Sequence, residues 1–367
     1  MAPDWLQVRA QFPALGHWTF LNTATFGQLP RSASQAVERH FAHRDELACA
    51  DFLEWFDDMD RVRAKVARLI GSRADDIAFV PNASAGLAIL LNGIEWKPGD
   101  EVVTLRGEFP NNPYAASALA RVGVRLVEAE NWDGFYSALS PRTRLALLST
   151  ANYASGFLPP LKEAAPVLRE RGILLYVDGT QSIGALRFDV EEIQPDFLAV
   201  DGYKWLLCPN GAAFAYVPAR VRKWLRPNVI GWRSDSGWRN VNQLNHGAPD
   251  LPHQAERYEG GMIPFALLYA MEASLDLMLS LGVDTIERRV VDLARKTAAL
   301  LRRRGAEVED NGSPIVAARF PSRDVSQLAA ALQERRILVA ARHGFLRVSP
   351  HLYNNEDDLQ RLDEALA

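Results

Sequence analysis

The chain has 367 residues, a formal net charge of −4 at pH 7 and 48% hydrophobic residues. This length exceeds what one compact core usually accommodates, so we expect two domains. Because the chain is weakly acidic and has no basic run, its charge gives no reason to expect nucleic-acid binding. Its apolar stretches are well short of the roughly 20 residues that cross a bilayer, so no membrane-spanning helix is predicted.

The cysteines and the first residues bear on the cellular compartment. Two cysteines, Cys49 and Cys208, provide no disulfide framework and fit a reducing environment. The opening MAPDWLQVRAQFP lacks a basic segment followed by an apolar one, so no signal peptide is expected. We therefore predict a cytoplasmic protein. The histidines show no metal-ligand spacing, and no metal is expected.

Short apolar runs alternate with helical patterns from about residue 77 onward. Strands are predicted at 77–80, 101–105, 124–129, 144–150, 173–178, 196–201 and 211–217. Helices that separate several of them are predicted at 84–94, 112–122 and 161–172. Continuous apolar strands alternating with helices indicate an α/β fold with a mostly parallel sheet covered on both faces.

The last third of the chain changes character. Segment 225–262 shows weak periodicity and is predicted to be a long ordered loop of the kind that often carries function. Two long helices follow, at 264–281 and 284–304. Strands at 315–320, 337–341 and 345–349 and helices near 324–335 and 355–366 complete the pattern. These elements favour a smaller α+β domain.

Lys204 follows directly after the apolar strand 196–201, in the segment DGYKW. Burying an unpaired ammonium group is costly. The cost is avoided if the amine is neutral or bound as an imine, and lysines of this kind carry out Schiff-base chemistry. The alternative is an ordinary lysine at a strand end that reaches water.

Asp178 ends the apolar strand 173–178, at the sheet edge where open α/β proteins bind ligands. A carboxylate there could keep a pyridinium nitrogen protonated, so that the ring acts as an electron sink. The alternative is a cap for the following segment. Earlier in the chain, the segment PNASAG at 81–86 lies between a strand and a helix, where backbone N–H groups and the Ser84 hydroxyl could bind a phosphate. An ordinary helix cap is the alternative there.

The order of these motifs, a phosphate-type loop, then Asp178, then Lys204, resembles the fold-type I enzymes that use pyridoxal 5′-phosphate (PLP). It is similar in particular to the class V aminotransferase group, which includes cysteine desulfurases, kynureninase and isopenicillin N epimerase-like proteins. The resemblance runs from FPALGHWTFLNTATFGQLP at 12–30 to RVSPHLYNNEDDLQRL at 347–362. It implies a PLP-binding homodimer with active sites at the subunit interface.

The resemblance also implies a domain division and a set of cofactor contacts. Residues 1–30 would contribute to the active site, 31–282 would form the large PLP-binding domain and 283–367 the small domain. Lys204 would hold the cofactor and move protons at the substrate Cα, and Asp178 would pair with the pyridine nitrogen. The remaining implied contacts are Gln181 and Asn152 at the phenolic oxygen, Phe109 stacked on the ring, and Ala83, Ser84, Tyr203 and Asp201 at the phosphate.

The implied substrate contacts come from three separate segments. Arg347 would bind the substrate carboxylate through two parallel hydrogen bonds, because its planar guanidinium matches that group. Asn22 would lie near the active site. Trp232 and Arg233 could contact the substrate, with simple loop packing as the alternative. A surface ion pair is the alternative for Arg347.

The sequence departs from the family pattern at two points, one of which bears on the reaction and one on a cofactor contact. Desulfurases have a nucleophilic cysteine shortly before the position of Arg347, but residues 339–346 read VAARHGFL. Cys49 is expected in an N-terminal helix and Cys208 lies beyond the lysine, so persulfide-forming desulfuration is not expected. Met262 replaces a threonine that in the family reaches the partner subunit's phosphate, which puts that contact in doubt.

The sequence therefore predicts a PLP-dependent enzyme that acts on a small α-amino acid, with transamination as the leading reaction. A Cβ-lyase of the C-S lyase type and an epimerase are the alternatives, because all three reactions begin at the same carbon. A non-catalytic protein that keeps the fold as a sensor or scaffold is the alternative from another class. A nucleotide-binding protein is disfavoured, since neither G-x-G-x-x-G nor G-x-x-x-x-G-K-[ST] is present.

Overall fold

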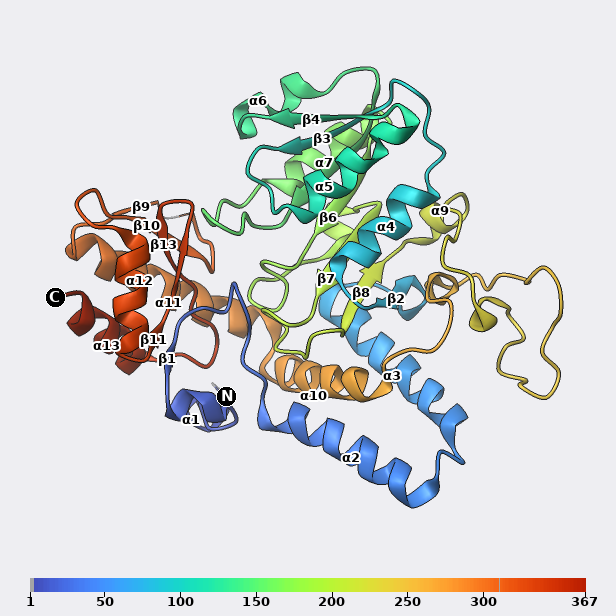
Figure 1. Cartoon of the computed structure of the whole chain (residues 1–367), viewed down its shortest axis with the longest axis horizontal. Coiled ribbons are helices and arrows are strands. Elements are labelled where there is room, and N and C mark those ends of the chain that lie inside the picture. The colour runs from blue at the N-terminus through green and yellow to red at the C-terminus, as the bar shows by residue number, and fades with distance from the viewer. Residues whose placement is uncertain (1–2, 310) are drawn as a thin grey trace.

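The computed structural model describes residues 3–309 and 311–367. A central sheet lies between two layers of helices, and a smaller body formed by the C-terminal residues packs to one side of it (Figure 1). The N-terminal segment lies against this smaller body before the chain enters the large one. The fold is thus α/β with a mostly parallel sheet, and the predicted fold class is confirmed.

The central sheet has seven strands in the order β2-β8-β7-β6-β5-β3-β4. Five neighbouring strands, from β7 to β4, are parallel, and only β8 pairs in an antiparallel manner, with β7 and with β2. The strands are β2 (Ile77–Val80), β3 (Glu101–Leu105), β4 (Arg125–Ala129), β5 (Thr143–Ser149), β6 (Leu174–Asp178), β7 (Phe197–Asp201) and β8 (Ala213–Tyr216). Each predicted strand is present, with ends that differ by at most two residues.

Helices bury both faces of the sheet because consecutive strand residues point to opposite sides. On one face α4 (Ala83–Gly93) and α5 (Asn111–Ser117) pack in a core that includes Val102 and Leu147. The other face packs against α3 (Phe52–Ile70), α7 (Leu161–Glu170) and α10 (Phe265–Leu281). The short helices α6 (Trp132–Ala138), α8 (Val190–Ile193) and α9 (Ala219–Arg222) lie in connections between strands or beyond the last one.

The N-terminal segment contains more structure than the sequence analysis identified. A short helix α1 (Trp5–Arg9) is followed by the strand β1 (Thr19–Phe20) and the long helix α2 (Arg31–Leu47), which packs on α10. Cys49 was expected in a helix, and this is wrong. It lies in the turn between α2 and α3 with a left-handed φ of 63°, a conformation that a helix does not contain.

The small body has its own core. The helix α11 (Val283–Arg303) leads into a four-stranded antiparallel sheet, β12-β13-β10-β9, which is covered by α12 (Val325–Glu334) and α13 (Glu356–Leu366). Its strands are β9 (Glu307–Val308), β10 (Val316–Arg319), β12 (Ala340–Arg342) and β13 (Phe345–Val348). The strand β11 (Ile337–Leu338) instead pairs with β1, which fastens the N-terminal segment to this body. The division at residue 282 stays a prediction.

Within residues 3–309 and 311–367, no single helix is long and apolar enough to cross a bilayer. The consecutive helices α10 and α11 meet that test only when taken together, and their axes turn by 84° at Gly282.

The long connection after α9 is ordered by one buried carboxylate. Between residues 223 and 264 the chain forms only two short 3-10 helices, Trp232–Ser234 and Ala255–Tyr258. Glu259 accepts hydrogen bonds from Arg63 at 2.6 Å, from Arg233 at 3.0 Å and from the Phe79 backbone nitrogen at 2.8 Å. Its side chain is fully buried. Glu259 therefore joins this loop to α3 and to the strand β2.

Replacing Glu259 with Gln should destabilise the protein. Burial alone would raise the pKa of Glu259, but the guanidinium groups of Arg63 and Arg233 hold that pKa below its usual value. Removing the carboxylate charge leaves the guanidinium groups of Arg63 and Arg233 buried without their anionic partner. This should lower the free energy of unfolding by about 3–5 kcal/mol. The group contributes above the unfolded pKa, so the difference from wild type should shrink as the pH falls below 4.5. Denaturant unfolding at several pH values measures both effects.

The exposed pair Glu95–Arg226 provides the matched control for this measurement. Glu95→Gln should change the free energy of unfolding by about 0–1 kcal/mol, as exposed pairs do. Equal effects of the two substitutions would show that Glu259 does not hold the loop in place.

Candidate active site

The candidate site lies at the carboxyl ends of the parallel strands, where the loops after β5, β6 and β7 meet the N-terminus of α4. A hollow with about 400 Å³ of empty space opens there, and we call it the lysine pocket. Eight of its lining residues are predicted site residues: Ala83, Ser84, Phe109, Asp178, Gln181, Asp201, Tyr203 and Lys204.

Lys204 is buried in this pocket, with 6% of the residue exposed. Burial lowers the pKa of its amine to about 8, although the carboxylates of Asp178 and Asp201 oppose the change. The nitrogen lies 5.3 Å from the ring centre of Phe109 and 5.4 Å from that of Tyr203. At neutral to mildly alkaline pH an appreciable fraction of the amine is neutral, the form that can attack a carbonyl carbon.

Asp178 ends β6 in the floor of the pocket and is also buried. One carboxylate oxygen accepts a hydrogen bond from the Thr180 backbone nitrogen at 2.9 Å. Burial raises the pKa of Asp178, and both this hydrogen bond and Lys204 act against that rise. The residue thus caps a local turn, as the alternative reading expected, and also leaves one carboxylate oxygen for a ligand.

The loop before α4 has the features of an anion site, with one exception. The Asn82 side chain accepts from the Ala85 nitrogen at 2.8 Å, which fixes the start of the helix. The Ser84 hydroxyl donates to the Asn111 side chain at 2.5 Å. The exception is the Ala83 backbone nitrogen, which donates to the carboxylate of Asp201 at 3.0 Å and is therefore not free to bind an anion. Burial, with a contribution from Asp178, raises the pKa of Asp201 to about 6.

Arg347 extends from β13 of the small body and is only 2% exposed. Its Nη1 donates to the Tyr153 carbonyl oxygen at 2.5 Å, and its Nη2 donates to the Thr25 hydroxyl at 2.5 Å. Asn22 also accepts from Nη2, at 3.4 Å, so the structure brings these two predicted residues together. The buried Nε has no acceptor, and no carboxylate among the described residues pairs with this guanidinium.

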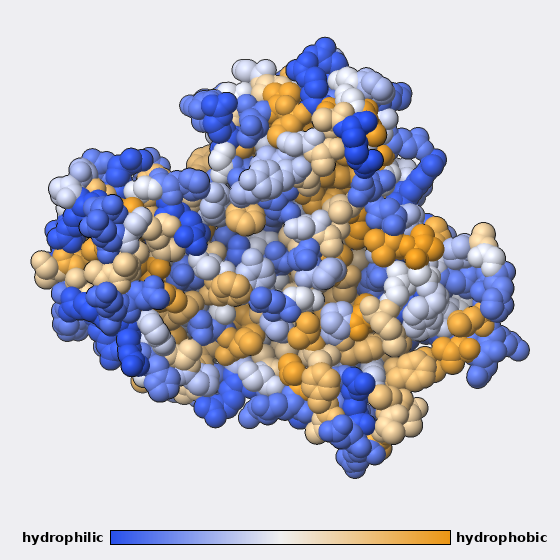
Figure 2. Space-filling model, viewed as in Figure 1, coloured by the Kyte–Doolittle hydropathy of each residue, from blue (hydrophilic) through white to orange (hydrophobic). Residues whose placement is uncertain are grey.

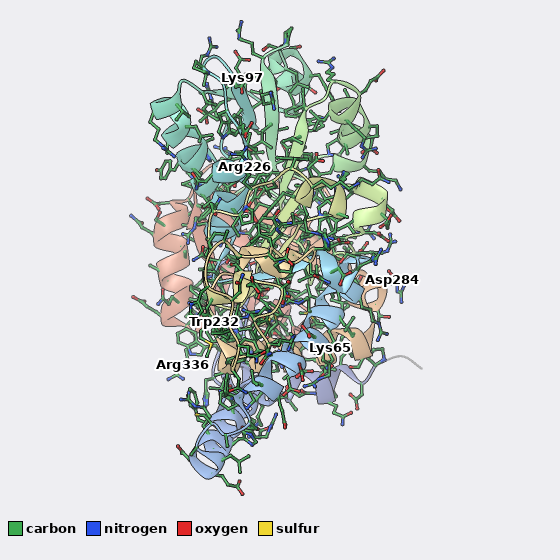
Figure 3. All side chains as sticks on the ribbon, turned by 90° about the vertical axis from the view of Figure 1, so that its right-hand side faces the viewer. Lys65, Lys97, Arg226, Trp232, Asp284 and Arg336 are labelled. Atoms are coloured by element: carbon green, nitrogen blue, oxygen red, sulfur yellow. The ribbon has the colours of Figure 1, made fainter. Side chains whose placement is uncertain are left out.

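Besides Asn22 and Arg347, three further predicted residues do not line the lysine pocket. The Asn152 side chain accepts from the Ala154 and Ser155 nitrogens of its own loop and donates to the Gly107 carbonyl oxygen in the loop after β3. Arg233 is buried in the ion pair with Glu259. Trp232 lies on the surface of the long loop, which faces the viewer in Figure 3. Their contacts with cofactor or substrate stay predictions.

Five lining residues were not identified from the sequence: Asn111, Ser149, Ala151, Tyr153 and Thr180. All of them lie within three residues of a predicted one, and all except Ala151 are polar. The signal in the sequence was therefore a polar residue close to a predicted site residue. A further buried group, Glu108, accepts from the Ser149 nitrogen at 3.0 Å and thereby ties the loop that carries Phe109 to β5. Burial raises the pKa of Glu108 to about 7.

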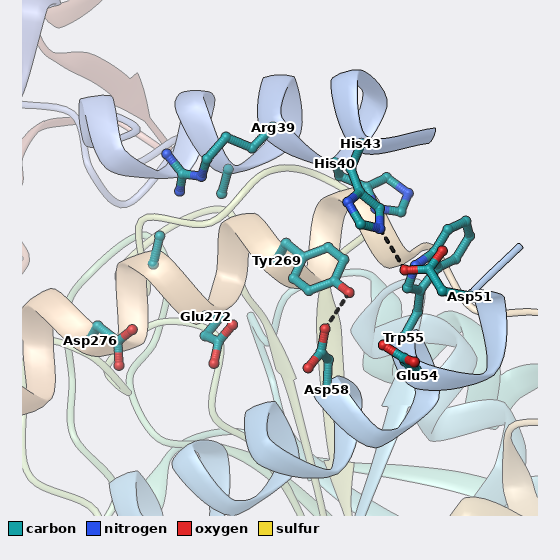
Figure 4. A pocket seen from close by; sticks show the side chains of 12 residues that line it. Arg39, His40, His43, Asp51, Glu54, Trp55, Asp58, Tyr269, Glu272 and Asp276 are labelled. Carbon is teal, nitrogen blue, oxygen red and sulfur yellow. Dashed lines mark hydrogen bonds and ion pairs between the residues drawn. The ribbon is translucent and has the colours of Figure 1, made fainter. Parts of the chain in front are cut away.

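A second hollow, with about 970 Å³ of empty space, lies between α2, α3 and α10 (Figure 4). Its polar groups are largely satisfied within the protein: His43 bonds to Asp51 at 2.6 Å and Tyr269 to Asp58 at 2.7 Å. Glu272 pairs with Arg61 and Lys65 from α3. This hollow belongs to the packing of the three helices and contains no group with the environment of Lys204.

Neither cysteine lines the lysine pocket. Burial raises the pKa of the Cys208 thiol to about 12, so it remains protonated and unreactive at neutral pH. Cys49 lies in the turn between α2 and α3. The geometry therefore agrees with the expectation that no thiol acts in the pocket.

The fold and the buried lysine define a PLP-dependent enzyme of fold type I. The model of the family "Aminotransferase class-V" matches residues 52–362, and the chain belongs to this family. The chain is 26% identical to an uncharacterised aminotransferase, YcbU, from Bacillus subtilis, over 98% of this chain and 97% of that protein. It is 29% identical to isopenicillin N epimerase from Streptomyces clavuligerus, over 99% and 98%.

Solved structures show the same fold at lower identity. The cystine C-S lyase C-DES, in complex with its product cysteine persulfide, superposes with a TM-score of 0.89 at 22% identity, covering 97% of this chain and 99% of that one. A C-DES mutant with glycine covalently linked to its PLP cofactor also superposes with a TM-score of 0.89 at 22% identity, covering 100% and 99%.

The residues present fit PLP at three points of the lysine pocket. Lys204 supplies a buried amine of lowered pKa, Asp178 supplies a buried carboxylate oxygen, and the start of α4 supplies Ser84 and Asn111. Phe109 provides an aromatic ring beside the amine. PLP is the cofactor of this family, and the implied cofactor is confirmed. The individual contacts stay predictions.

Asp201 should make PLP affinity depend on pH. An ionised carboxylate next to the phosphate-type loop would repel a phosphate, and Asp201 ionises near pH 6. Asp201→Asn should therefore bind PLP more tightly than wild type, with a ratio of dissociation constants that grows from about pH 5 to pH 7 and then stays constant. We expect a ratio on the order of tenfold, equivalent to about 1.4 kcal/mol.

Titration of the apoprotein with PLP, followed by visible absorbance, measures these affinities. Both proteins carry Lys204→Ala in this titration, because Asp201 raises the pKa of the Lys204 amine and its replacement would otherwise change imine formation as well. The exposed Asp133 on α6 is the control, and Asp133→Asn should leave the ratio near one at every pH. A flat ratio for Asp201→Asn would remove Asp201 from the phosphate site.

Proposed function

We propose that this PLP-dependent enzyme acts at the Cα atom of a small α-amino acid, with transamination as its main reaction. The observation that carries the proposal is the buried guanidinium of Arg347 beside the lysine pocket. A buried cation is stable only with a partner, yet Arg347 has no carboxylate partner among the described residues. The carboxylate of an amino acid would complete this site.

The chain's own residues have separate tasks in this proposal. Lys204 and Asp178 would hold the cofactor at its reactive carbon and its ring nitrogen, while Ser84, Asn111 and Tyr203 would surround its phosphate. When bound, PLP supplies an electron sink for the electron pair left at Cα. Lys204, whose neutral form is accessible near pH 8, would take the Cα proton.

Asp178 and Arg347 would orient these groups. The negative charge of Asp178 favours a protonated ring nitrogen, which strengthens the electron sink. Arg347 would fix the carboxylate and so select which Cα bond stands perpendicular to the ring, the geometry that decides the reaction. Its fixed hydrogen bonds to the Tyr153 carbonyl oxygen and the Thr25 hydroxyl hold the guanidinium in place.

Inversion at Cα is the second candidate reaction, favoured by the 29% identity to an isopenicillin N epimerase over 99% of the chain. It needs no thiol, in agreement with a pocket that no cysteine lines. Elimination from Cβ, as the name of the C-S lyase C-DES describes for that protein, is a further alternative within the same fold.

We further propose that the enzyme is a cytoplasmic homodimer. Apolar side chains are exposed on the loop after α9, among them Val229, Ile230 and Met262, and Figure 2 shows apolar atoms at the surface on this side of the molecule. A second copy of the chain would cover them. Met262, 63% exposed, has no hydrogen-bond donor in its side chain, so any contact with a partner's phosphate would use backbone N–H groups.

Arg347→Lys tests the proposed carboxylate site. Lysine keeps the charge but loses the planar fork, so binding and turnover of α-amino acids should weaken together. The expected loss in kcat/KM corresponds to about 2–5 kcal/mol, the range for one partner of a buried charge pair. Steady-state kinetics with amino acids, and with amines that lack a carboxylate, measures this loss. The amines should be little affected.

Arg361→Lys, at an exposed position on α13, is the control and should leave kcat/KM unchanged. The visible absorbance of the holoenzyme should be the same in all three proteins. An unchanged kcat/KM for amino acids in Arg347→Lys would mean that the substrate carboxylate binds elsewhere.

A further inference from the structure

Tyr153 and His343 form a hydrogen-bonded pair at the edge of the lysine pocket. Tyr153 lies in the loop after β5, and His343 lies at the tip of the β12–β13 hairpin, where its φ of 48° is left-handed. The Tyr153 hydroxyl and His343 Nε2 are 2.5 Å apart. This contact joins the large body to the small one. Both groups can donate and accept a proton.

The pair stands on the opposite side of Asp178 from Lys204. In the sheet, β6 lies between β7 and β5. Asp178 ends β6, Lys204 follows β7 and Tyr153 follows β5. Lys204 and Tyr153 therefore line the same pocket at separate positions along the sheet edge, with Asp178, the carboxylate that would position the cofactor ring, on the strand between them.

Tyr153 lies among the groups that would bind cofactor and substrate. Its ring packs edge-on against Phe109 at 5.1 Å, and the Phe109 ring faces the Lys204 nitrogen. Its carbonyl oxygen accepts from Arg347, the proposed carboxylate site. Burial raises the pKa of Tyr153, and the positive charges of Arg342 and Arg347 partly offset that rise by favouring the phenolate.

We propose that Tyr153, hydrogen-bonded to His343, is a second proton-transfer group, the group that inversion of configuration at Cα, the second candidate reaction above, would require besides Lys204. The inference rests on the proposed function, which requires only Lys204. Inversion needs one proton-transfer group on each face of Cα, and the proposal places Tyr153 on the face opposite to Lys204.

The proton balance of the proposed step is complete. Neutral Lys204 takes the Cα proton, and the electron pair of the broken C–H bond stays with the substrate and the electron sink. The Tyr153 hydroxyl then donates its proton to the opposite face of Cα, where the same electron pair forms the new C–H bond. His343 replaces the proton of Tyr153 from solvent, and Lys204 returns its proton to solvent. The reverse direction exchanges these roles.

Deuterium exchange separates the two proton-transfer groups. Holoenzyme would be incubated in D₂O with L-alanine, L-glutamate or L-phenylalanine. Mass spectrometry measures deuterium at Cα, and chiral chromatography measures the D-isomer. Wild type should form both deuterated L-isomer and D-isomer with at least one of the three. Tyr153→Phe should lose inversion by about 10²–10⁴-fold, the range for removing a general acid or base, but retain exchange in the L-isomer. Lys204→Ala should lose both.

The outcomes distinguish this inference from the proposed function. Exchange without inversion in wild type, or equal loss of exchange and inversion in Tyr153→Phe, overturns the second proton-transfer group while Lys204 chemistry stands. No exchange by wild type with any of the three amino acids overturns the proposed function itself. His343→Gln should slow inversion but leave exchange in the L-isomer unchanged, a separation that a purely structural role would not produce.

The hydrogen bond can be tested without cofactor or turnover. In apoprotein labelled with ¹⁵N-histidine, the Nε2 resonance of His343, assigned through His343→Gln, should shift in Tyr153→Phe. The resonances of His17, which does not line the pocket, should not move. An unshifted His343 resonance would show that the pair does not form in solution.

Discussion

The amine of Lys204 lies in the interior at the edge of a parallel sheet, and this arrangement depends on charges that the strands place around it. Burial lowers the pKa of the amine, while Asp178 at the end of β6 and Asp201 at the end of β7 act in the opposite direction. The parallel strands bring these ends together because their carboxyl termini share one edge. The same edge holds the start of α4, so amine, carboxylates and phosphate-type loop meet in one pocket.

The small body completes the site from the other side. Arg347 on β13 extends toward the loop that carries Tyr153, and the N-terminal segment supplies Asn22 and Thr25 to the same guanidinium. Pairing of β1 with β11 keeps that segment in position. Three segments far apart in the chain thus converge on one buried cation, which explains why the family resemblance extends from the N-terminal segment to the last helices.

The strands and the positions of Lys204 and Asp178 could be predicted from sequence because both depend on local patterns, an apolar run and a charged residue at its end. Arg347 was found only through the family resemblance, since nothing local distinguishes a buried arginine from a surface one. The positions of the other predicted residues depend on tertiary contacts. Arg233 pairs with Glu259, Asn152 binds backbone groups of two loops, and Cys49 lies in a turn, none of which the sequence pattern shows. The Tyr153–His343 pair joins residues 190 positions apart, beyond the reach of any local pattern.

The central claim, that Lys204 is the residue to which the cofactor is attached, has a direct test. Reduction of the holoenzyme with borohydride would fix the cofactor to its lysine, and peptide mapping by mass spectrometry would locate it. The account predicts one modified peptide, containing Asp201-Gly202-Tyr203-Lys204-Trp205, with the added mass on Lys204. A cofactor adduct on another lysine, with Lys204 unmodified, would contradict it.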